Sequence, residues 1–293
     1  MLHPLRLLRT QLMAIDLGAP VLQHTADFSA SSLHAPRARA AFLQRLCQRA
    51  CRLHHLDVQV TGELPDEPVI YVANHLGYVD PVAICSLTPC APIAKLEVAS
   101  WPVIGAICRQ MNVIFVRRDD TGNAARALRL AVRRLEAGVS VLNFPEGTTT
   151  RGDVLGFRRG VFGVSGKLGI PVVPLALSFA APGLCWVDDD SFVAHYARTV
   201  IGTAHSVQIQ VGPLMRLRAG ETATEFAARA RAWIVAARRR GEGTPEPQAR
   251  RPLPGVVHAV GVAPRVERQV RELAAAATTA VQVQTRSVRR DAR

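Results

Sequence analysis

Short apolar runs alternate with amphipathic segments through the middle of this 293-residue chain. The runs are rich in valine and isoleucine and end at turn-forming residues, which is typical of buried β-strands. The clearest helix covers 123–137, where Leu128, Val132 and Leu135 share one face and Gly138 follows as a C-terminal cap. Strands that alternate with helices predict an α/β domain, with a mixed, largely parallel sheet flanked by helices. The predicted strands are 69–73, 113–116, 139–144, 172–177 and 207–211, and shorter helices are expected from Pro81 and near 98–110.

Two longer amphipathic segments lie on either side of this region. The first begins at Pro36 and runs to about Leu53, with apolar residues on one face and arginines mostly elsewhere. It fits a helix in a membrane interface, where arginines meet anionic lipids, or a helix packed on the domain with a solvated charged face. The second begins with a capping-box pattern, Thr222 to Glu225.

Composition divides the chain into three parts. We predict that 1–55 is an N-terminal basic amphipathic segment that associates with a membrane, because 28–56 has arginines and no acidic residue. Residues 56–240 carry the strand and helix pattern. Residues 241–293 begin with a proline- and glycine-rich linker and lack aromatic residues, which predicts a basic, disordered tail.

An uncharged stretch of the chain, 168–187, is nominally long enough to cross a bilayer. Its three prolines favour a buried strand followed by a loop, and a membrane span is the less favoured alternative. The six cysteines form no C-x-x-C pair and sit in apolar stretches, so we expect reduced, mostly buried thiols and no zinc site.

The net charge of +13 comes almost entirely from arginine, because Lys95 and Lys167 are the only lysines. This balance favours an anionic partner, which could be nucleic acid, an anionic membrane or a phosphorylated substrate. A nucleic-acid-binding module is the alternative from a non-enzyme class. Aromatic residues make up only 5% of the chain and do not alternate with the arginines in a known motif, which disfavours that module.

Chemically reactive residues follow the predicted strands. His75 comes after 69–73, Arg118 after 113–116, and Glu146 after 139–144. Because the carboxyl ends of parallel strands lie at one edge of a sheet, we expect these side chains to gather there.

Asp80 follows His75 by five residues. A regular helix would separate the two side chains by about 140°, whereas a turn would let the carboxylate hold one imidazole nitrogen. The simpler alternative is that Asp80 and Pro81 only start a helix.

Four segments, in order, resemble the conserved blocks of the glycerophospholipid acyltransferases, the family that contains lysophosphatidic acid acyltransferase. They are NHLGYVD (74–80), VIFVRR (113–118), FPEGTTTR (144–151) and IPVVPLAL (170–177), and FRRGVF (157–162) resembles the stretch after the third block. The resemblance covers about 56–215 and implies that 56–240 is an acyltransferase domain. Asn112 departs from it, since glycine usually begins the second block.

The resemblance implies roles for particular residues. His75 would be the general base and Asp80 would orient it, so these two are the predicted catalytic residues. The predicted substrate-binding residues are Arg118, Glu146, Gly147 and Thr148. No metal or permanently bound cofactor is implied.

The implied reaction is O-acyl transfer from acyl-CoA or acyl-carrier protein to the free hydroxyl of a lysolipid. The default acceptor is 1-acylglycerol-3-phosphate; a lyso-ornithine lipid is the alternative, because LCWVDDDSFVAH (184–195) looks similar to members that act on it. The expected partners are the lysolipid, the donor and an anionic membrane surface, with no nucleic acid. The expected location is the cytoplasmic face of the inner membrane, peripheral or N-terminally anchored.

Overall fold

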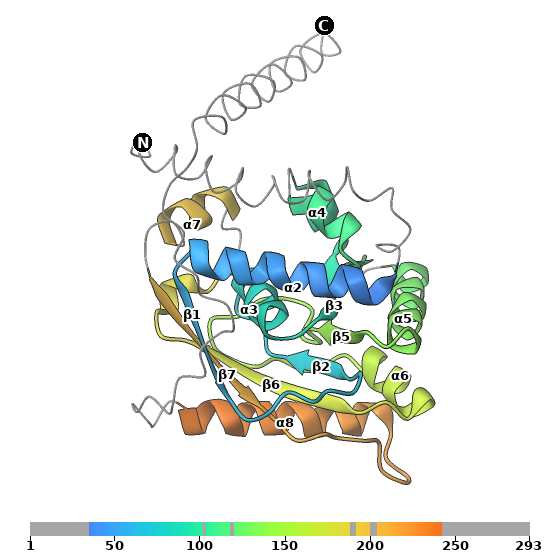
Figure 1. The fold of residues 1–293 in the computed structure, drawn as a ribbon. Helices are drawn as coiled ribbons and strands as arrows, with labels where there is room; N and C mark the ends of the chain where they lie inside the picture. The colour runs from blue at the N-terminus through green and yellow to red at the C-terminus, as the bar shows by residue number, and fades with distance from the viewer. Residues whose placement is uncertain (1–34, 102–103, 118–119, 188–191, 200–203, 242–293) are drawn as a thin grey trace, which may run out of the picture. The chain divides into compact units, whose positions relative to one another are not determined.

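The computed structural model describes residues 35–101, 104–117, 120–187, 192–199 and 204–241 (Figure 1). The strands are β1 (Leu56–Thr61), β2 (Ile70–Ala73), β3 (Cys90–Lys95), β4 (Ile114–Val116), β5 (Ser140–Asn143), β6 (Val172–Phe179) and β7 (His205–Val211). The helices are α2 (Pro36–Leu53), α3 (Val79–Leu87), α4 (Ile104–Gln110), α5 (Thr121–Glu136), α6 (Gly160–Leu168), α7 (Phe192–Thr199) and α8 (Ala223–Gly241), with 3-10 turns η2 (Leu96–Ser100) and η3 (Pro182–Leu184).

The strands form one sheet in the order β1-β7-β6-β2-β5-β3-β4. Neighbouring strands are parallel except β6 and β7, which are antiparallel. Helices α2 and α8 lie on opposite faces of the sheet (Figure 1). The prediction of a mixed, largely parallel sheet flanked by helices is therefore confirmed.

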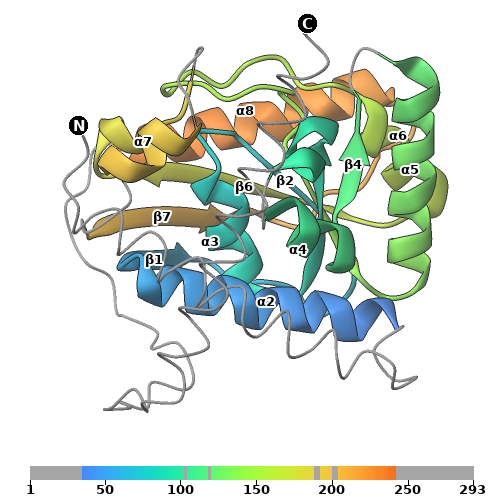
Figure 2. The ribbon, with the colours of Figure 1, turned by 90° about the horizontal axis from the view of Figure 1, so that it is seen from above.

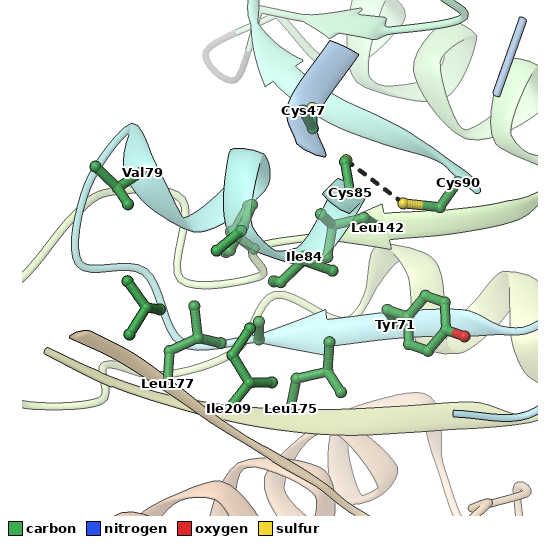
Figure 3. Packing of buried hydrophobic residues seen from close by; sticks show 14 of the residues in the cluster. Cys47, Tyr71, Val79, Ile84, Cys85, Cys90, Leu142, Leu175, Leu177 and Ile209 are labelled. Atoms are coloured by element: carbon green, nitrogen blue, oxygen red, sulfur yellow. Dashed lines mark hydrogen bonds between the residues drawn. The ribbon is translucent and has the colours of Figure 1, made fainter. Parts of the chain in front are cut away.

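Strand β2 lies at the centre of the sheet and is buried on both faces. Tyr71 packs in the cluster that includes α2 and α3, while Ile70 and Val72 pack in the cluster with α5, α6 and α8. Figure 3 shows part of the first cluster, where Tyr71 lies among residues of α3, β5, β6 and β7. An apolar strand with no polar alternation is what burial on both faces requires.

Helix α2 has the predicted ends and packs on the domain. Its apolar face is buried, and Gln44 Nε2 and Gln48 Nε2 donate to carbonyl oxygens near the end of α3, each at 3.0 Å. Figure 2 shows α2 passing from β1 to the C-terminal end of α5, where Arg37 Nε donates to Ala137 O at 3.0 Å. The apolar face of α2 is thus unavailable to a membrane, which leaves only its arginines for contact with lipid. The rest of the predicted membrane segment, 1–34, and the predicted tail from 242 lie outside the described residues.

The stretch considered as a possible membrane span, 168–187, contains β6, whose first six residues are buried in the sheet. The spanning alternative is wrong, because this segment is extended and pairs with β2 and β7. Among the helices in the described ranges, none is long and apolar enough to cross a membrane. Five of the six cysteines are buried and all six are free thiols, and Cys85 Sγ lies 3.6 Å from Cys90 Sγ (Figure 3).

Candidate active site

The site forms where β2 and β5, which are parallel neighbours, reach their carboxyl ends. Asn74 follows β2 and is fully buried. Its Nδ2 donates to Leu177 O at 3.1 Å, and its Oδ1 accepts from Leu177 N at 2.8 Å. The side chain therefore binds β6 as a backbone amide would, and it holds the next residue, His75, at a defined point on the sheet edge.

His75 and Asp80 contact each other across a tight turn. His75 Nδ1 lies 2.7 Å from Asp80 Oδ2, and the same oxygen accepts from Leu76 N at 2.6 Å and Gly77 N at 2.9 Å. Asp80 Oδ2 already accepts two backbone N–H groups, so we assign it as the acceptor in its contact with the imidazole as well. In this assignment Nδ1 of His75 carries the proton and Nε2 carries the lone pair. The Asp80 side chain is fully buried, whereas 16% of the His75 side chain is exposed. Helix α3 begins at Val79, slightly before Pro81, where a helix was expected, so Asp80 lies in its first turn.

Phe144 fixes the plane of the imidazole. Its ring, at the end of β5, is stacked on His75 with centroids 4.1 Å apart and planes 19° apart. Since Asp80 holds one nitrogen and Phe144 holds one face, the ring has little freedom to rotate. The sequence marked Phe144 as part of a family block, and its contact with His75 was not anticipated.

Glu146 joins the two strand ends through backbone amides. Its carboxylate is buried, with Oε1 accepting from His75 N at 2.8 Å and Oε2 accepting from Leu155 N at 2.7 Å. Burial raises the pKa of Glu146, and the hydrogen bonds from Leu155 and His75 oppose that rise. These bonds hold protein groups, so a direct contact of Glu146 with substrate stays a prediction.

The segment after β5, 145–159, is an irregular loop that returns to the site. Thr150 N donates to His75 O at 2.9 Å, and Arg158 N donates to Pro145 O at 3.0 Å. Gly147 has φ +82°, and a Cβ on it would meet Arg158 Nε at 3.0 Å. Glycine therefore allows both the left-handed backbone and the close approach of the Arg158 guanidinium.

Residues 55–178 match the protein family described as Acyltransferase. This segment belongs to the acyltransferase family. It contains the His75–Asp80 turn and the whole of the loop that carries Glu146. The acyltransferase domain therefore includes each of the six residues that the sequence predicted for the site.

Two similar proteins and one solved structure extend the comparison. The chain is 33% identical over 169 residues to a lyso-ornithine lipid O-acyltransferase of Pseudomonas aeruginosa, covering 56% of this chain and 65% of that protein. It is 31% identical over 164 residues to 1-acyl-sn-glycerol-3-phosphate acyltransferase alpha of Mus musculus, covering 50% of this chain and 58% of that protein. The matches thus span less than two thirds of each relative.

The fold is similar to the crystal structure of the 1-acyl-sn-glycerophosphate (LPA) acyltransferase PlsC from Thermotoga maritima. The TM-score is 0.56, with 22% identity over 83% of this chain and all of that chain. At 22% identity, this likeness concerns the fold alone.

Two predicted substrate-binding residues, Thr148 and Arg118, take no part in the contacts described above. Thr148 is exposed on the same loop as Glu146. Arg118 lies outside the described residues, directly after Arg117, whose backbone N donates to Asn123 Oδ1 at 2.7 Å. Strand β4, which precedes them, is separated from β5 by β3. Contact of Arg118 with a substrate stays a prediction.

Aromatic residues from a later segment cover the His75–Asp80 turn of the acyltransferase domain. Trp186 N donates to Leu76 O at 2.9 Å, and a Cβ on Gly77 would lie 3.2 Å from Trp186 N. The ring of Tyr78 meets Trp186 and Phe192 edge to face, with centroids 5.7 and 4.9 Å apart. The sequence did not predict this packing, because Trp186 and Tyr78 are joined only by the tertiary fold.

Proposed function

We propose that this chain is a lysolipid O-acyltransferase, which transfers a fatty acyl group from an acyl thioester to the free hydroxyl of a lysolipid. The observation that carries the proposal is the hydrogen bond between His75 Nδ1 and Asp80 Oδ2, in a segment that belongs to the acyltransferase family. A partly exposed imidazole with its lone pair on Nε2 suits a general base.

The reaction would proceed in one displacement. His75 Nε2 takes the proton of the acceptor hydroxyl as the oxygen forms a bond to the thioester carbonyl carbon. Asp80 stabilises the imidazolium that results and keeps the ring in position. The tetrahedral intermediate then collapses, the carbon–sulfur bond breaks, and the leaving thiolate takes the proton from His75. No acyl-enzyme is required, because a thioester is already an activated acyl group.

The first candidate acceptor is 1-acylglycerol-3-phosphate. Arg158 supports it, because its guanidinium lies beside Gly147 on the loop that carries Glu146. A guanidinium binds phosphate through two parallel hydrogen bonds, which favours a phosphate-bearing head group. Arg118 would be a second phosphate contact if it reaches this edge of the sheet.

A lyso-ornithine lipid is the second candidate acceptor. The similarity to the Pseudomonas aeruginosa protein supports it, because the identity of 33% over 65% of that protein exceeds the 31% over 58% of the mouse relative. The segment that places Trp186 against the His75–Asp80 turn belongs to the stretch whose sequence suggested this acceptor. The donor would be acyl-CoA or acyl-carrier protein.

An anionic membrane surface is the proposed partner that supplies the lysolipid, at the cytoplasmic face of the inner membrane. Arg37, Arg45 and Arg52 are exposed along α2. Each lies seven or eight residues from the next, which is about two helical turns, so the three side chains lie on the same side of the helix. This arginine stripe (Arg37, Arg45 and Arg52) would contact lipid phosphates without insertion of the helix, since the apolar face is buried.

The test is acyl transfer with purified full-length protein, labelled acyl-CoA or acyl-carrier protein, and a panel of lysolipids. We expect one lysolipid class to be acylated, and His75→Ala to lower kcat by about 10²- to 10⁴-fold, as loss of a general base does. The melting temperature of the variant serves as the control for folding. Acyl transfer that persists undiminished in His75→Ala would remove the mechanism.

The same panel separates the two acceptors. If the acceptor carries a phosphate, Arg158→Ala should raise its KM by about 10-fold or more, the cost of about one charged hydrogen-bonding contact. Preference for the lyso-ornithine lipid in the wild-type protein would replace the first candidate by the second. Acylation of neither lipid would overturn both.

A further inference from the structure

Helix α8 holds the loop that carries Glu146. Arg231 Nε donates to Val154 O at 3.0 Å and to Leu155 O at 2.8 Å, and about two turns further along the helix, Arg238 donates to Gly152 O. These arginines thus bind the backbone carbonyl oxygens of three of the four loop residues 152–155, all except Asp153.

Apolar packing supports the same contact. Val154 is buried in a cluster with Ile234 and Ala237 of α8 and Ala176 of β6. On α8, Arg231, Ile234 and Arg238 follow one another at three and four residues, so they share one face of the helix. The loop after β5 therefore rests on α8 through both a buried side chain and its carbonyl groups.

One peptide group connects Arg231 to Glu146. The carbonyl of Val154 and the N–H of Leu155 belong to the same trans peptide and point in opposite directions. Arg231 binds its oxygen and Glu146 Oε2 accepts from its N–H, at 2.7 Å. A cation on the oxygen polarises the amide and makes its N–H a stronger donor.

The other oxygen of Glu146 accepts the backbone N–H of His75, at 2.8 Å. A continuous series of hydrogen bonds therefore runs from the guanidinium of Arg231, through one peptide group and one buried carboxylate, to the backbone of His75. On the other side of the carboxylate, His75 is itself hydrogen-bonded through Nδ1 to Asp80 Oδ2, at 2.7 Å.

We propose that Arg231 is a positioning residue for the acyl transfer described above, acting on His75 through the Val154–Leu155 peptide and Glu146. The inference rests on the proposed function. Arg231 lies outside the segment that matches the acyltransferase family, so that match does not assign it a role. It touches neither His75 nor Asp80 directly, and its effect passes through the loop.

Arg229 is the matched control on the same helix. It binds Glu221 at 2.7 Å and Arg216 O at 2.8 Å, on the connection that precedes α8, and makes none of the loop contacts described for Arg231. Arg229→Ala and Arg231→Ala each remove one guanidinium and its hydrogen bonds from α8. Only the second removes the bond to the Val154–Leu155 peptide.

The first test needs no substrate. Hydrogen exchange of the loop amides reports how often their hydrogen bonds open. We expect Arg231→Ala to speed exchange of the Leu155 amide by about 10-fold or more, because the loop opens more often. Arg229→Ala should leave it unchanged. Equal rates in Arg231→Ala and the wild-type protein would overturn the proposal, even if acyl transfer were never detected.

The second test is a double-mutant cycle on kcat. Misplacement of a catalytic group lowers the rate by up to about 100-fold, so we expect Glu146→Gln to lower kcat by about 100-fold. Arg231→Ala should lower kcat by about 10-fold with KM within about twofold. Because Arg231 acts through Glu146, the double variant should be no slower than Glu146→Gln alone. Arg231→Lys, which keeps a charged donor, should recover most of the activity.

The outcomes separate the two proposals. Multiplied losses in the double variant would mean that Arg231 acts independently of Glu146, which overturns the inference while the enzyme remains an acyltransferase. If the wild-type protein shows no acyl transfer but the Leu155 amide still exchanges faster in Arg231→Ala, the proposed function is overturned. The link from α8 to the loop is then retained.

Discussion

The carboxylate of Asp80 receives three hydrogen bonds on one oxygen. The donors are the imidazole Nδ1 of His75 and the backbone N–H groups of Leu76 and Gly77. The backbone groups fix the carboxylate, and the carboxylate fixes the ring, so the orientation of His75 is decided within one turn. Such a carboxylate acts on the tautomer and on the charge of the imidazolium rather than on the substrate.

Substitution Asp80→Asn tests this role with little change in volume. The amide can donate to Nδ1 and thereby place the proton on Nε2, which would remove the lone pair needed by a base. We expect kcat to fall by about 10³- to 10⁴-fold, as when the orienting carboxylate of a comparable triad is neutralised. The measurement is kcat with the lysolipid that the panel of acceptors identifies, and a circular dichroism spectrum checks that the variant is folded. A kcat within tenfold of the wild-type value would show that the carboxylate is dispensable.

The two carboxylates of the site differed in how far the sequence could place them. His75 and Asp80 are five residues apart, so a single turn sufficed to predict their contact. Glu146 binds the backbone of His75 across 71 residues of chain, which depends on β2 and β5 being neighbours. Its hydrogen bonds to His75 N and Leu155 N were not foreseeable from the residue type.

Helix α6 was not predicted, and its packing explains why it forms. Gly163 and Gly166 each weaken a helix by about 1 kcal/mol relative to alanine, so the local pattern was unfavourable. Phe162 is fully buried between Phe157 and Phe226, with ring centroids 6.3 and 5.4 Å away. Burial of one aromatic face against α8 thus outweighs the poor propensity of the segment.

Truncation of this aromatic contact should destabilise the domain strongly. We expect Phe162→Ala to lower the free energy of unfolding by about 3–5 kcal/mol, because the side chain is fully buried and leaves a cavity. Denaturant unfolding followed by tryptophan fluorescence measures it. Leu214→Ala, at a side chain that is 50% exposed, is the control and should change the value by less than about 0.5 kcal/mol. Similar losses in both variants would contradict this account of α6.

Strand β3 was missed for a different reason. Its sequence, CAPIAK, carries Pro92, which argues against a central strand. In the sheet, β3 pairs with β5 from Cys90 to Pro92 and with β4 from Ile93 onward. The change of partner strand at Pro92 accommodates the N–H that proline lacks, and this change is visible only once the neighbouring strands are known.

Strand β1, which was also missed, lies at the other end of the sheet, where exposed polar residues interrupt its apolar pattern.

The positive charge of the chain is unevenly placed on the described surface. Residues 28–56 contain no acidic residue, and the arginine stripe lies on the outer face of α2. Helix α8 carries arginines on the opposite face of the sheet (Figure 1). If anionic lipid is the partner, the two faces should therefore be distinguishable by charge reversal.

Binding to lipid vesicles provides that comparison. We expect Arg45→Glu with Arg52→Glu to weaken partition onto vesicles of phosphatidylglycerol and phosphatidylcholine by about 10-fold or more, at about 1 kcal/mol per arginine near the surface. Arg218→Glu with Arg239→Glu makes the same change of net charge away from α2 and should have a smaller effect. Binding of the wild-type protein should fall steeply at about 0.5 M salt, where surface charges are screened.

Either of two results would contradict a membrane role for the arginine stripe. One is an equal effect of the two charge-reversed pairs, which would indicate attraction by net charge alone. The other is binding that withstands high salt, since insertion of residues beyond the described ranges would then dominate.

Local sequence patterns were enough to predict five of the strands, β2, β4, β5, β6 and β7, together with the ends of α2 and the turn that joins His75 to Asp80. These features depend on periodicity and on contacts a few residues long, which local chemistry decides. The tertiary structure decided the partner of each strand, the hydrogen bonds of Glu146, the stacking of Phe144 on His75 and the support that α8 gives the loop. Each of these joins residues far apart in the chain, and such contacts form only when burial of the shared core brings the segments together.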